Sequence, residues 1–182
     1  MESIREQKKQ LRKQMRALLK EQEIISLTSR SDKVAQRILE HEQVQKASTI
    51  LSYWSLSSEA PTHELNKLLA KEKMVLLPVI DGPDLYLSIY DPQAPLTKEG
   101  IYGIAEPTGQ AFEEYEKVDL VIVPGLAFGA QGQRCGKGKG YYDKTLQKLV
   151  NAYTLGLGFD FQIHDNVPME AHDIVLNEVI AV

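Results

Sequence analysis

The sequence contains a single cysteine, a single tryptophan and no long run of apolar residues. One cysteine excludes an intrachain disulfide and is typical of a protein from a reducing compartment. No stretch approaches the roughly 18 consecutive apolar residues that suggest a membrane-spanning helix. The charged N-terminus, MESIREQKKQLRKQM, lacks the apolar core of a signal peptide. These absences predict a cytoplasmic protein.

A strong net charge of either sign is also missing. The 21 Lys and Arg residues against 25 Asp and Glu residues give a formal charge of −4 and a pI near 5.6. A protein of this charge offers no global attraction for nucleic acid or a membrane surface. Any bound anion must therefore be held by a local cluster. We expect small-molecule substrates, no nucleic acid, no membrane and a monomer.

The 182 residues contain no internal repeat and no low-complexity linker, so we expect one domain over residues 1–182. Helical spacing of apolar residues predicts helices over 3–21, from Ser26 or Thr28 to about His41, from Thr62 through HELNKLLAK, and over 141–150. Apolar or alternating runs predict strands at 48–54, 84–90, 119–125, 153–159 and 173–182, and one within KMVLLPVI that ends at Pro78.

This alternation of strands and helices predicts the α/β class. We expect a mostly parallel sheet flanked by helices on both faces. The hairpin-like middle of the chain predicts an antiparallel addition at one edge, followed by an irregular stretch over 91–109. Ligands of such sheets bind beyond the carboxyl ends of the strands.

The stretch RCGKGKGYYDKT, residues 134–145, occupies such a position, because it follows the strand at 119–125 and precedes a helix. Glycines allow close approach of backbone N–H groups to an anion at a helix N-terminus. Lysines and an arginine add positive charge, and Asp143 is an oxygen ligand suited to Mg²⁺. The pattern predicts a nucleotide-phosphate site with magnesium.

Known phosphate-binding motifs do not match this loop. A P-loop requires Ser or Thr after its lysine, whereas Lys137 is followed by Gly138, and a dinucleotide fingerprint requires G-x-G-x-x-G. A flexible surface loop rich in glycine and lysine therefore remains an alternative. On the first predicted helix an apolar stripe is accompanied by a basic one, which also fits a solvated face; the two stripes are Ile4, Leu11, Met15 and Leu18, and Arg5, Lys9, Arg12, Arg16 and Lys20.

The segment VDLVIVPGLAFGAQGQRCGKGKGYYDKTL, residues 118–146, resembles the signature of the 5-formyltetrahydrofolate cyclo-ligases, also called methenyltetrahydrofolate synthetases. Shorter pieces resemble the same family in the same order along nearly the whole chain: KKQLRKQMR, EAPT, LPVI, GIAEP, GLGFDFQ and VPMEAHD. The resemblance implies a ligase that uses ATP, with Mg²⁺, to cyclise 5-formyltetrahydrofolate to 5,10-methenyltetrahydrofolate, releasing ADP and phosphate.

The resemblance also implies roles for individual residues. The expected ATP-binding residues are Lys8, Arg12, Arg134, Gly136, Lys137, Gly138, Lys139, Gly140, Tyr141 and Tyr142. The expected folate-binding residues are Trp54, Glu59, Lys137, Gly138, Lys139, Gly140 and Tyr141. Catalytic roles fall to Lys139, Arg134 and Tyr141, and Asp143 is the expected magnesium ligand.

Each assignment has a structural alternative. Lys8 and Arg12 also fit a solvated basic face, and Trp54 also fits ordinary core packing. Glu59 also fits an exposed turn. Asp143 also fits a first-turn residue favoured by the helix dipole, and Tyr142 a packed aromatic residue.

Two positions depart from the family pattern. Gly129 stands where the family usually has an aspartate, and Asn177 is aligned with a second magnesium carboxylate that some members have. These departures leave a catalytically impaired folate- or nucleotide-binding relative on the same fold as an alternative. A further alternative is a relative on the same fold that uses another phosphorylated substrate. We expect no metal site from the spacing of the four histidines and no nucleophilic role for Cys135.

Overall fold

The computed structural model describes residues 2–22, 31–97, 103 and 105–182. The expected helix start at Ser26 or Thr28 lies outside these residues, as do parts of the irregular stretch 91–109. Among the described helices, none has both the length and the apolar character that crossing a membrane requires.

Seven strands of the described chain form one sheet in the order β10-β8-β5-β1-β2-β3-β4. The five strands from β10 to β2 are parallel, whereas β3 and β4 join antiparallel at one edge. This arrangement confirms the predicted sheet and its antiparallel addition. The strands are β1 (Thr49–Leu51), β2 (Met74–Asp81), β3 (Asp84–Ile89), β4 (Ala111–Phe112), β5 (Leu120–Pro124), β8 (Tyr153–Gly158) and β10 (Glu178–Ala181).

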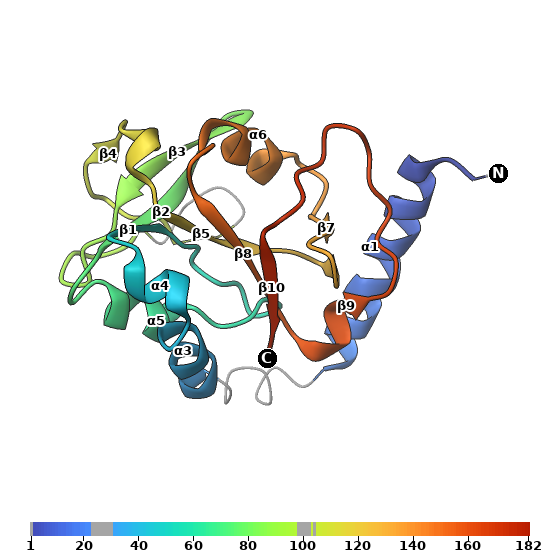
Figure 1. Cartoon of the computed structure of the whole chain (residues 1–182), viewed down its shortest axis with the longest axis horizontal. Coiled ribbons are helices and arrows are strands. Elements are labelled where there is room, and N and C mark those ends of the chain that lie inside the picture. The colour runs from blue at the N-terminus through green and yellow to red at the C-terminus, as the bar shows by residue number, and fades with distance from the viewer. Residues whose placement is uncertain (1, 23–30, 98–102, 104) are drawn as a thin grey trace.

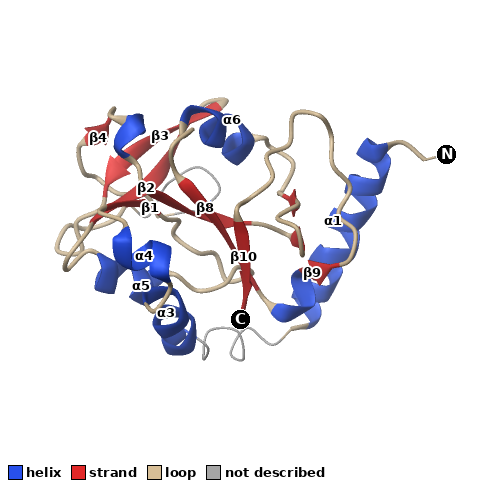
Figure 2. Cartoon of the chain, viewed as in Figure 1, coloured by secondary structure: helices blue, strands red, loops and turns tan. Residues whose placement is uncertain are grey.

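Helices cover both faces of the sheet, as predicted (Figures 1 and 2). Because successive side chains of a strand point to opposite faces, Leu120 and Ile122 of β5 pack in the core that includes α1, α3 and α5, while Val121 and Val123 pack in the core that includes α6. The helices are α1 (Ile4–Glu21), α3 (Ser31–Leu39), α4 (Glu42–Lys46), α5 (His63–Leu69) and α6 (Tyr141–Lys148), with 3-10 turns at Tyr115–Lys117 and Asp160–Gln162.

The first helix buries a different stripe from the one expected. Its N-cap is Ser3, whose hydroxyl accepts from the N–H of Glu6 at 3.3 Å. The buried side chains are Lys8, Leu11, Met15 and Leu19, whereas the predicted stripe members Ile4 and Leu18 are exposed. The buried face is therefore rotated around the helix axis, and it includes a lysine.

Several predicted boundaries were wrong. The β2 strand continues through Pro78 to Asp81. Because β1 pairs with β2 only as far as Leu76, β3 is the remaining neighbour of β2 at Pro78, so the missing proline N–H breaks no bond to β1. The β1 strand is shorter than 48–54, and β10 covers only the end of 173–182. A short helix, α4, was not expected.

A second, small sheet was also missed. It has the order β7-β6-β9, with strands β6 (Ala127–Gly129), β7 (Arg134–Cys135) and β9 (Ile163–His164). The β6 and β7 strands form a hairpin within the connection between β5 and α6. This hairpin carries the chain from the end of β5 to the glycine loop and sets the loop's position.

Candidate active site

The predicted site residues gather where two neighbouring parallel strands end. The strands β1 and β5 are adjacent, and the chain leaves them in different directions, since β2 lies beyond β1 and β8 beyond β5. Such a switch point is where open α/β sheets bind ligands. Trp54 and Glu59 follow β1, and the glycine loop, residues 136–140, follows β5 by way of the small hairpin.

The glycine loop has a backbone that only glycine adopts readily. Gly138 has a φ of 96° and Gly140 a φ of 73°, both in the left-handed region, and Gly140 is the N-cap of α6. The backbone at Gly138 also passes close to α1, because a Cβ there would lie 3.4 Å from the guanidinium carbon of Arg12. Lys137 and Lys139 are exposed on this loop.

The first helix lies against the glycine loop and brings Arg12 to it. The Nε–H of Arg12 donates to the carbonyl of Gly136 at 2.9 Å, and a guanidinium N–H of Arg16 donates to the carbonyl of Lys137 at 3.3 Å. Residues far apart in the sequence thus bring two guanidinium groups to the edge of the loop.

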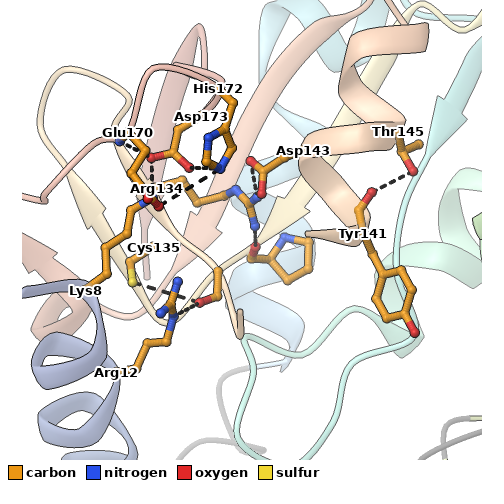
Figure 3. A network of polar contacts seen from close by, with 12 residues as sticks. Lys8, Arg12, Arg134, Cys135, Tyr141, Asp143, Thr145, Glu170, His172 and Asp173 are labelled. Carbon is orange, nitrogen blue, oxygen red and sulfur yellow. Dashed lines mark hydrogen bonds and ion pairs between the residues drawn. The ribbon is translucent and has the colours of Figure 1, made fainter. Parts of the chain in front are cut away.

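Lys8 is directed elsewhere. It is 3% exposed, and its ammonium group contacts Glu170 at 3.0 Å and forms a short ion pair with Asp173 (Figure 3). Both Lys8 and Arg12 were expected to bind ATP. In the structure Arg12 contacts the loop, whereas Lys8 contacts the 170–173 segment.

The 170–173 segment brings an acidic cluster to the site that the sequence reasoning missed. Ligand atoms of Glu170, His172 and Asp173 all lie within 4.8 Å of one another. The hydrogen bond from Lys8 lowers the pKa of Glu170. Burial raises the pKa of Asp173, but hydrogen bonds from Lys8 and the Glu170 N–H, with the Lys8 charge, lower it overall. The VPMEAHD motif was the signal for this cluster.

Arg134 and Asp143 form an ion pair beneath the glycine loop. A terminal guanidinium nitrogen of Arg134 lies 2.8 Å from Oδ1 of Asp143, and the arginine is 6% exposed. The guanidinium also lies over the ring of Tyr142, 5.7 Å from its centroid. The expected phosphate ligand and the expected magnesium ligand therefore contact each other.

Glu59 and Lys137 form a second ion pair, which joins the two halves of the site. The Nζ of Lys137 lies 2.5 Å from Oε1 of Glu59, and the other carboxylate oxygen accepts from the N–H of Leu56 at 2.9 Å. The Glu59 side chain is only 10% exposed. Burial, with the nearby Glu59 charge, raises the pKa of Tyr142, so this phenol stays protonated at neutral pH.

Trp54 packs in an aromatic cluster on the same side. Its ring stacks on His63 with centroids 4.0 Å apart and planes 15° apart, and Tyr90 lies 5.9 Å away. The Nε2–H of His63 donates to the carbonyl of Ser55 at 2.9 Å, and burial lowers the pKa of this histidine. No role for His63 was expected from the sequence, because partners from separate elements carry no spacing signal.

The two expected tyrosines differ in direction. The hydroxyl of Tyr141 donates to the carbonyl of Gly82, in the turn between β2 and β3, at 3.2 Å. Figure 3 shows the Tyr141 ring directed away from the Arg134–Asp143 pair. The hydroxyl of Tyr142 is buried and finds no hydrogen-bond partner in the described part of the chain.

The structure accounts for both departures from the family pattern. A Cβ at Gly129 would lie 2.2 Å from Oε1 of Gln133, so Gln133 occupies the space that a side chain would need. The amide oxygen of Asn177 accepts from the N–H and the hydroxyl of Thr154, each at 2.8 Å, and so fastens β10 to β8. Position 177 is thus engaged in the sheet, and Asp173 is the carboxylate nearer the site.

Cys135, in β7, is buried. Burial raises its pKa, although the charges of Arg12, Lys8 and Arg134 act in the opposite direction. A buried thiol that stays protonated is a poor nucleophile. The structure therefore agrees with the expectation that Cys135 is no nucleophile.

Comparisons with known proteins identify relatives over the full length of the chain. A profile of the 5-formyltetrahydrofolate cyclo-ligase family matches residues 3–182. The chain is 28% identical to the 5-formyltetrahydrofolate cyclo-ligase of Mus musculus, over 94% of this chain and 89% of that one. It is 32% identical to the enzyme of the same name from Escherichia coli K12, over 93% and 95%. The structure of Aquifex aeolicus 5,10-methenyltetrahydrofolate synthetase superposes with a TM-score of 0.84 at 29% identity, covering 96% of this chain and 89% of that chain.

Proposed function

The chain belongs to the 5-formyltetrahydrofolate cyclo-ligase family, and from this premise we propose that the site at the ends of β1 and β5 carries the family's ATP-dependent reaction. The enzyme uses ATP to cyclise 5-formyltetrahydrofolate to 5,10-methenyltetrahydrofolate and releases ADP and phosphate. The observation that carries the assignment of the site is the Lys137–Glu59 ion pair, which links the residue assigned to phosphate with the residue assigned to folate.

The chemistry explains why ATP is consumed. The N5-formyl group is an amide, and resonance makes its carbonyl a poor electrophile and its oxygen a poor leaving group. Transfer of the γ-phosphoryl group to that oxygen breaks the bond between the γ-phosphorus and the bridging oxygen and releases ADP. N10 then attacks the formyl carbon and loses its proton to solvent, and the C–O bond breaks to release phosphate. The protein must position the partners and stabilise charge on the transferring group.

We assign the ATP phosphates to the glycine loop. Backbone N–H groups over residues 136–140 precede the N-terminus of α6, where an anion is favoured. Arg12 lies beside the loop, and Lys137 and Lys139 project from it. Lys139 is the residue we assign to the charge that develops on the γ-phosphoryl group. Lys8, which pairs with Glu170 and Asp173, is assigned to holding the 170–173 segment.

We assign the folate to the segment after β1. The Glu59 carboxylate suits paired N–H donors of a pterin ring, and Trp54 offers an aromatic surface beside it. The stacked Trp54–His63 pair supports this assignment, because it holds the indole in one orientation. Tyr141 is assigned to the side of the site formed by the β2–β3 turn.

Magnesium fits Asp143 better than the other acidic groups. Asp143 uses Oδ1 for its ion pair, and within the described chain its Oδ2 accepts no hydrogen bond. Asp173 already binds Lys8 and the N–H of Glu170. We propose that Asp143 holds the ion, which when bound offsets the charge of the phosphate oxygens.

We further propose that the enzyme is a cytoplasmic monomer. The sole cysteine is free and buried, as suits a reducing compartment. Light scattering of the purified protein tests the oligomeric state.

The first test mixes the protein with 5-formyltetrahydrofolate and MgATP and follows the near-ultraviolet absorbance of the methenyl product. We expect the absorbance to grow only in the full mixture and not when ATP, magnesium or folate is omitted. The Asp143→Asn variant is expected to require at least about 10-fold more magnesium for half-maximal rate, because it loses a charged ligand. It should bind folate as the wild type does.

A flat trace with folded wild-type protein would contradict the proposal. Tight folate binding with no ATP consumption would identify the chain as the binding-only relative. Unchanged magnesium dependence in Asp143→Asn would remove this residue from the metal site.

A further inference from the structure

The basic stripe of α1 is largely unused by the site as assigned above. The first 21 residues contain seven Lys and Arg residues against three Asp and Glu residues, although the whole chain carries a formal charge of −4. Lys8 and Arg12 are engaged by the 170–173 segment and by the glycine loop. The exposed cations in the second half of the helix are Lys13, Arg16 and Lys20.

These three residues, which we call the α1 patch, form one surface. Residues three or four apart on a helix are neighbours, so Arg16 lies beside both Lys13 and Lys20. Like charges at this spacing destabilise a helix. The positions one turn from Lys13 and Arg16 hold no carboxylate to offset the repulsion, because they are occupied by lysine, arginine, glutamine, alanine and leucine.

The α1 patch differs in this respect from other lysines on helices of the described chain. Lys46 pairs with Glu42 on α4, and Lys67 pairs with Glu64 on α5, each within one helical turn. No carboxylate among the described residues forms an ion pair with a member of the α1 patch. Cations without an internal counter-charge, on a chain of negative net charge, suit an external ligand that carries several negative charges.

The α1 patch begins at the folate side of the site. A guanidinium N–H of Arg16 donates to the carbonyl of Lys137 at 3.3 Å, and Nζ of Lys137 lies 2.5 Å from Oε1 of Glu59. Along α1, contacts therefore progress from the glycine loop at Arg12 to the neighbourhood of Glu59 at Arg16. Lys20 lies one turn farther in the same direction.

A reduced folate carries its negative charge at the end remote from the pterin ring. There a glutamate is joined to the aminobenzoyl group and carries two carboxylates, and every further γ-linked glutamate adds one more. A chain of carboxylates is complementary to a row of exposed cations. The α1 patch provides such a row beside the segment to which we assign the pterin ring.

We propose that the α1 patch binds the glutamate tail of the folate substrate and favours folates that carry several γ-linked glutamates. This inference rests on the proposed function for the placement of the pterin ring at Glu59. Arg16 receives the carboxylates of the first glutamate, and Lys13 and Lys20 receive those of the glutamates that follow.

The test compares 5-formyltetrahydrofolate that carries one glutamate with the form that carries five. By calorimetry without ATP, we expect the wild type to bind the five-glutamate form at least about 10-fold more tightly at low ionic strength, because several weak exposed pairs act together. In about 0.5 M salt the difference should fall below about 3-fold, because exposed charges are screened.

Variants of the α1 patch separate its members. The double variant Lys13→Gln, Lys20→Gln should reduce the preference for the five-glutamate form to less than about 3-fold. Arg16→Gln should weaken binding of both forms by about 3- to 10-fold, and Arg16→Lys should recover most of this loss because it keeps the charge. These losses should appear in KM more than in kcat, since the tail is bound equally before and during the reaction.

The matched control is Lys33→Gln, an exposed lysine on α3 that should leave the full preference intact. Equal affinity of the wild type for the two folates would overturn the proposal. So would a loss of ATP affinity in the double variant as large as the loss of preference, because it would assign the α1 patch to phosphate. Tighter binding of a single-stranded oligonucleotide of equal charge would also overturn it and identify a nucleic-acid surface.

Formation of methenyl product from the one-glutamate form decides the proposed function separately. Product formation without a preference for the longer tail would retain the function and reject the tail site. A preference for the longer tail without product would retain the tail site and reject the function.

Discussion

The ammonium group of Lys137 and the carboxylate of Glu59 are 2.5 Å apart, although one belongs to the glycine loop and the other to the turn after β1. Each group thus neutralises the other. Under the proposed assignment, ATP phosphates would compete with Glu59 for Lys137, and folate N–H donors would compete with Lys137 for Glu59. Binding of the two substrates would thus replace the internal ion pair between Lys137 and Glu59 with contacts to each substrate.

This relationship predicts opposite effects of one substitution on the two substrates. Glu59→Gln should weaken folate binding by about 10-fold, because it removes a charged acceptor. It should strengthen ATP binding by about 2- to 5-fold, because it releases Lys137 from a partly exposed pair. Calorimetry with each substrate alone measures both. The control is Glu64→Gln, which releases Lys67 from an exposed pair on α5. Weaker ATP binding in Glu59→Gln would show that the two groups do not compete.

Lys139 is predicted to act on the transferring phosphoryl group more than on either bound substrate. Lys139→Ala should lower kcat by about 100-fold while changing folate affinity by less than about 2-fold, because charge stabilised only in the transition state affects the rate and not the ground state. Steady-state kinetics and folate titration supply the comparison. Lys33→Ala, at an exposed position of α3, is the control. Equal losses in kcat and folate affinity would mean that Lys139 holds substrate.

The Trp54–His63 stack predicts a fluorescence titration. Trp54 is the sole tryptophan, and burial lowers the pKa of His63 below its usual 6.5. A protonated imidazole quenches a stacked indole, so emission should fall as the pH decreases through a midpoint below about 6.5. Because the folded state disfavours the charged form, protonation should also reduce stability below the unfolded pKa.

His63→Gln should abolish this titration, and His41→Gln, which changes a histidine paired with Glu178, should leave it intact. A titration that persists in His63→Gln would assign the quenching to another group. Emission that changes on adding folate would support Trp54 as a wall of the folate site.

The Lys8–Asp173 pair predicts how the protein responds to acid. The folded pKa of Asp173 is lowered, so the pair contributes stability above the usual carboxyl pKa of 3.8, and this contribution is lost as the pH falls through the lower folded value. Glu170, whose pKa is also lowered, acts in the same direction. Stability of the wild type should therefore decline steeply at acid pH.

Asp173→Asn should unfold about 1 to 3 kcal/mol more easily at neutral pH, since Lys8 loses a buried charged partner but keeps Glu170. Its stability should fall less steeply than that of the wild type as the pH drops below about 4. Urea unfolding at several pH values measures both quantities. Asp84→Asn removes an exposed pair with Lys144 and should change stability by less than about 0.5 kcal/mol. Parallel pH curves for Asp173→Asn and the wild type would exclude this linkage.

Much of the architecture follows from local patterns. The apolar run of β5 predicts a central strand, the alternating residues 84–90 predict β3 within the antiparallel addition, and glycines at every second position predict a backbone loop before α6. These features depend on side-chain periods of a strand or a helix and on the conformations of glycine, all of which are properties of short segments. The family signature lies in the same segments.

The directions of the site's side chains were decided only by the tertiary structure. Lys8 and Arg12 share a face of α1, yet one contacts Asp173 and the other contacts Gly136. Arg134 was expected in an open phosphate loop, yet it is buried against Asp143. A sequence determines which residues are charged and which faces are apolar, because these properties belong to single residues and short periods. It does not display which distant carboxylate will stand opposite each cation, because that pairing arises only when separate elements pack into one low-dielectric interior.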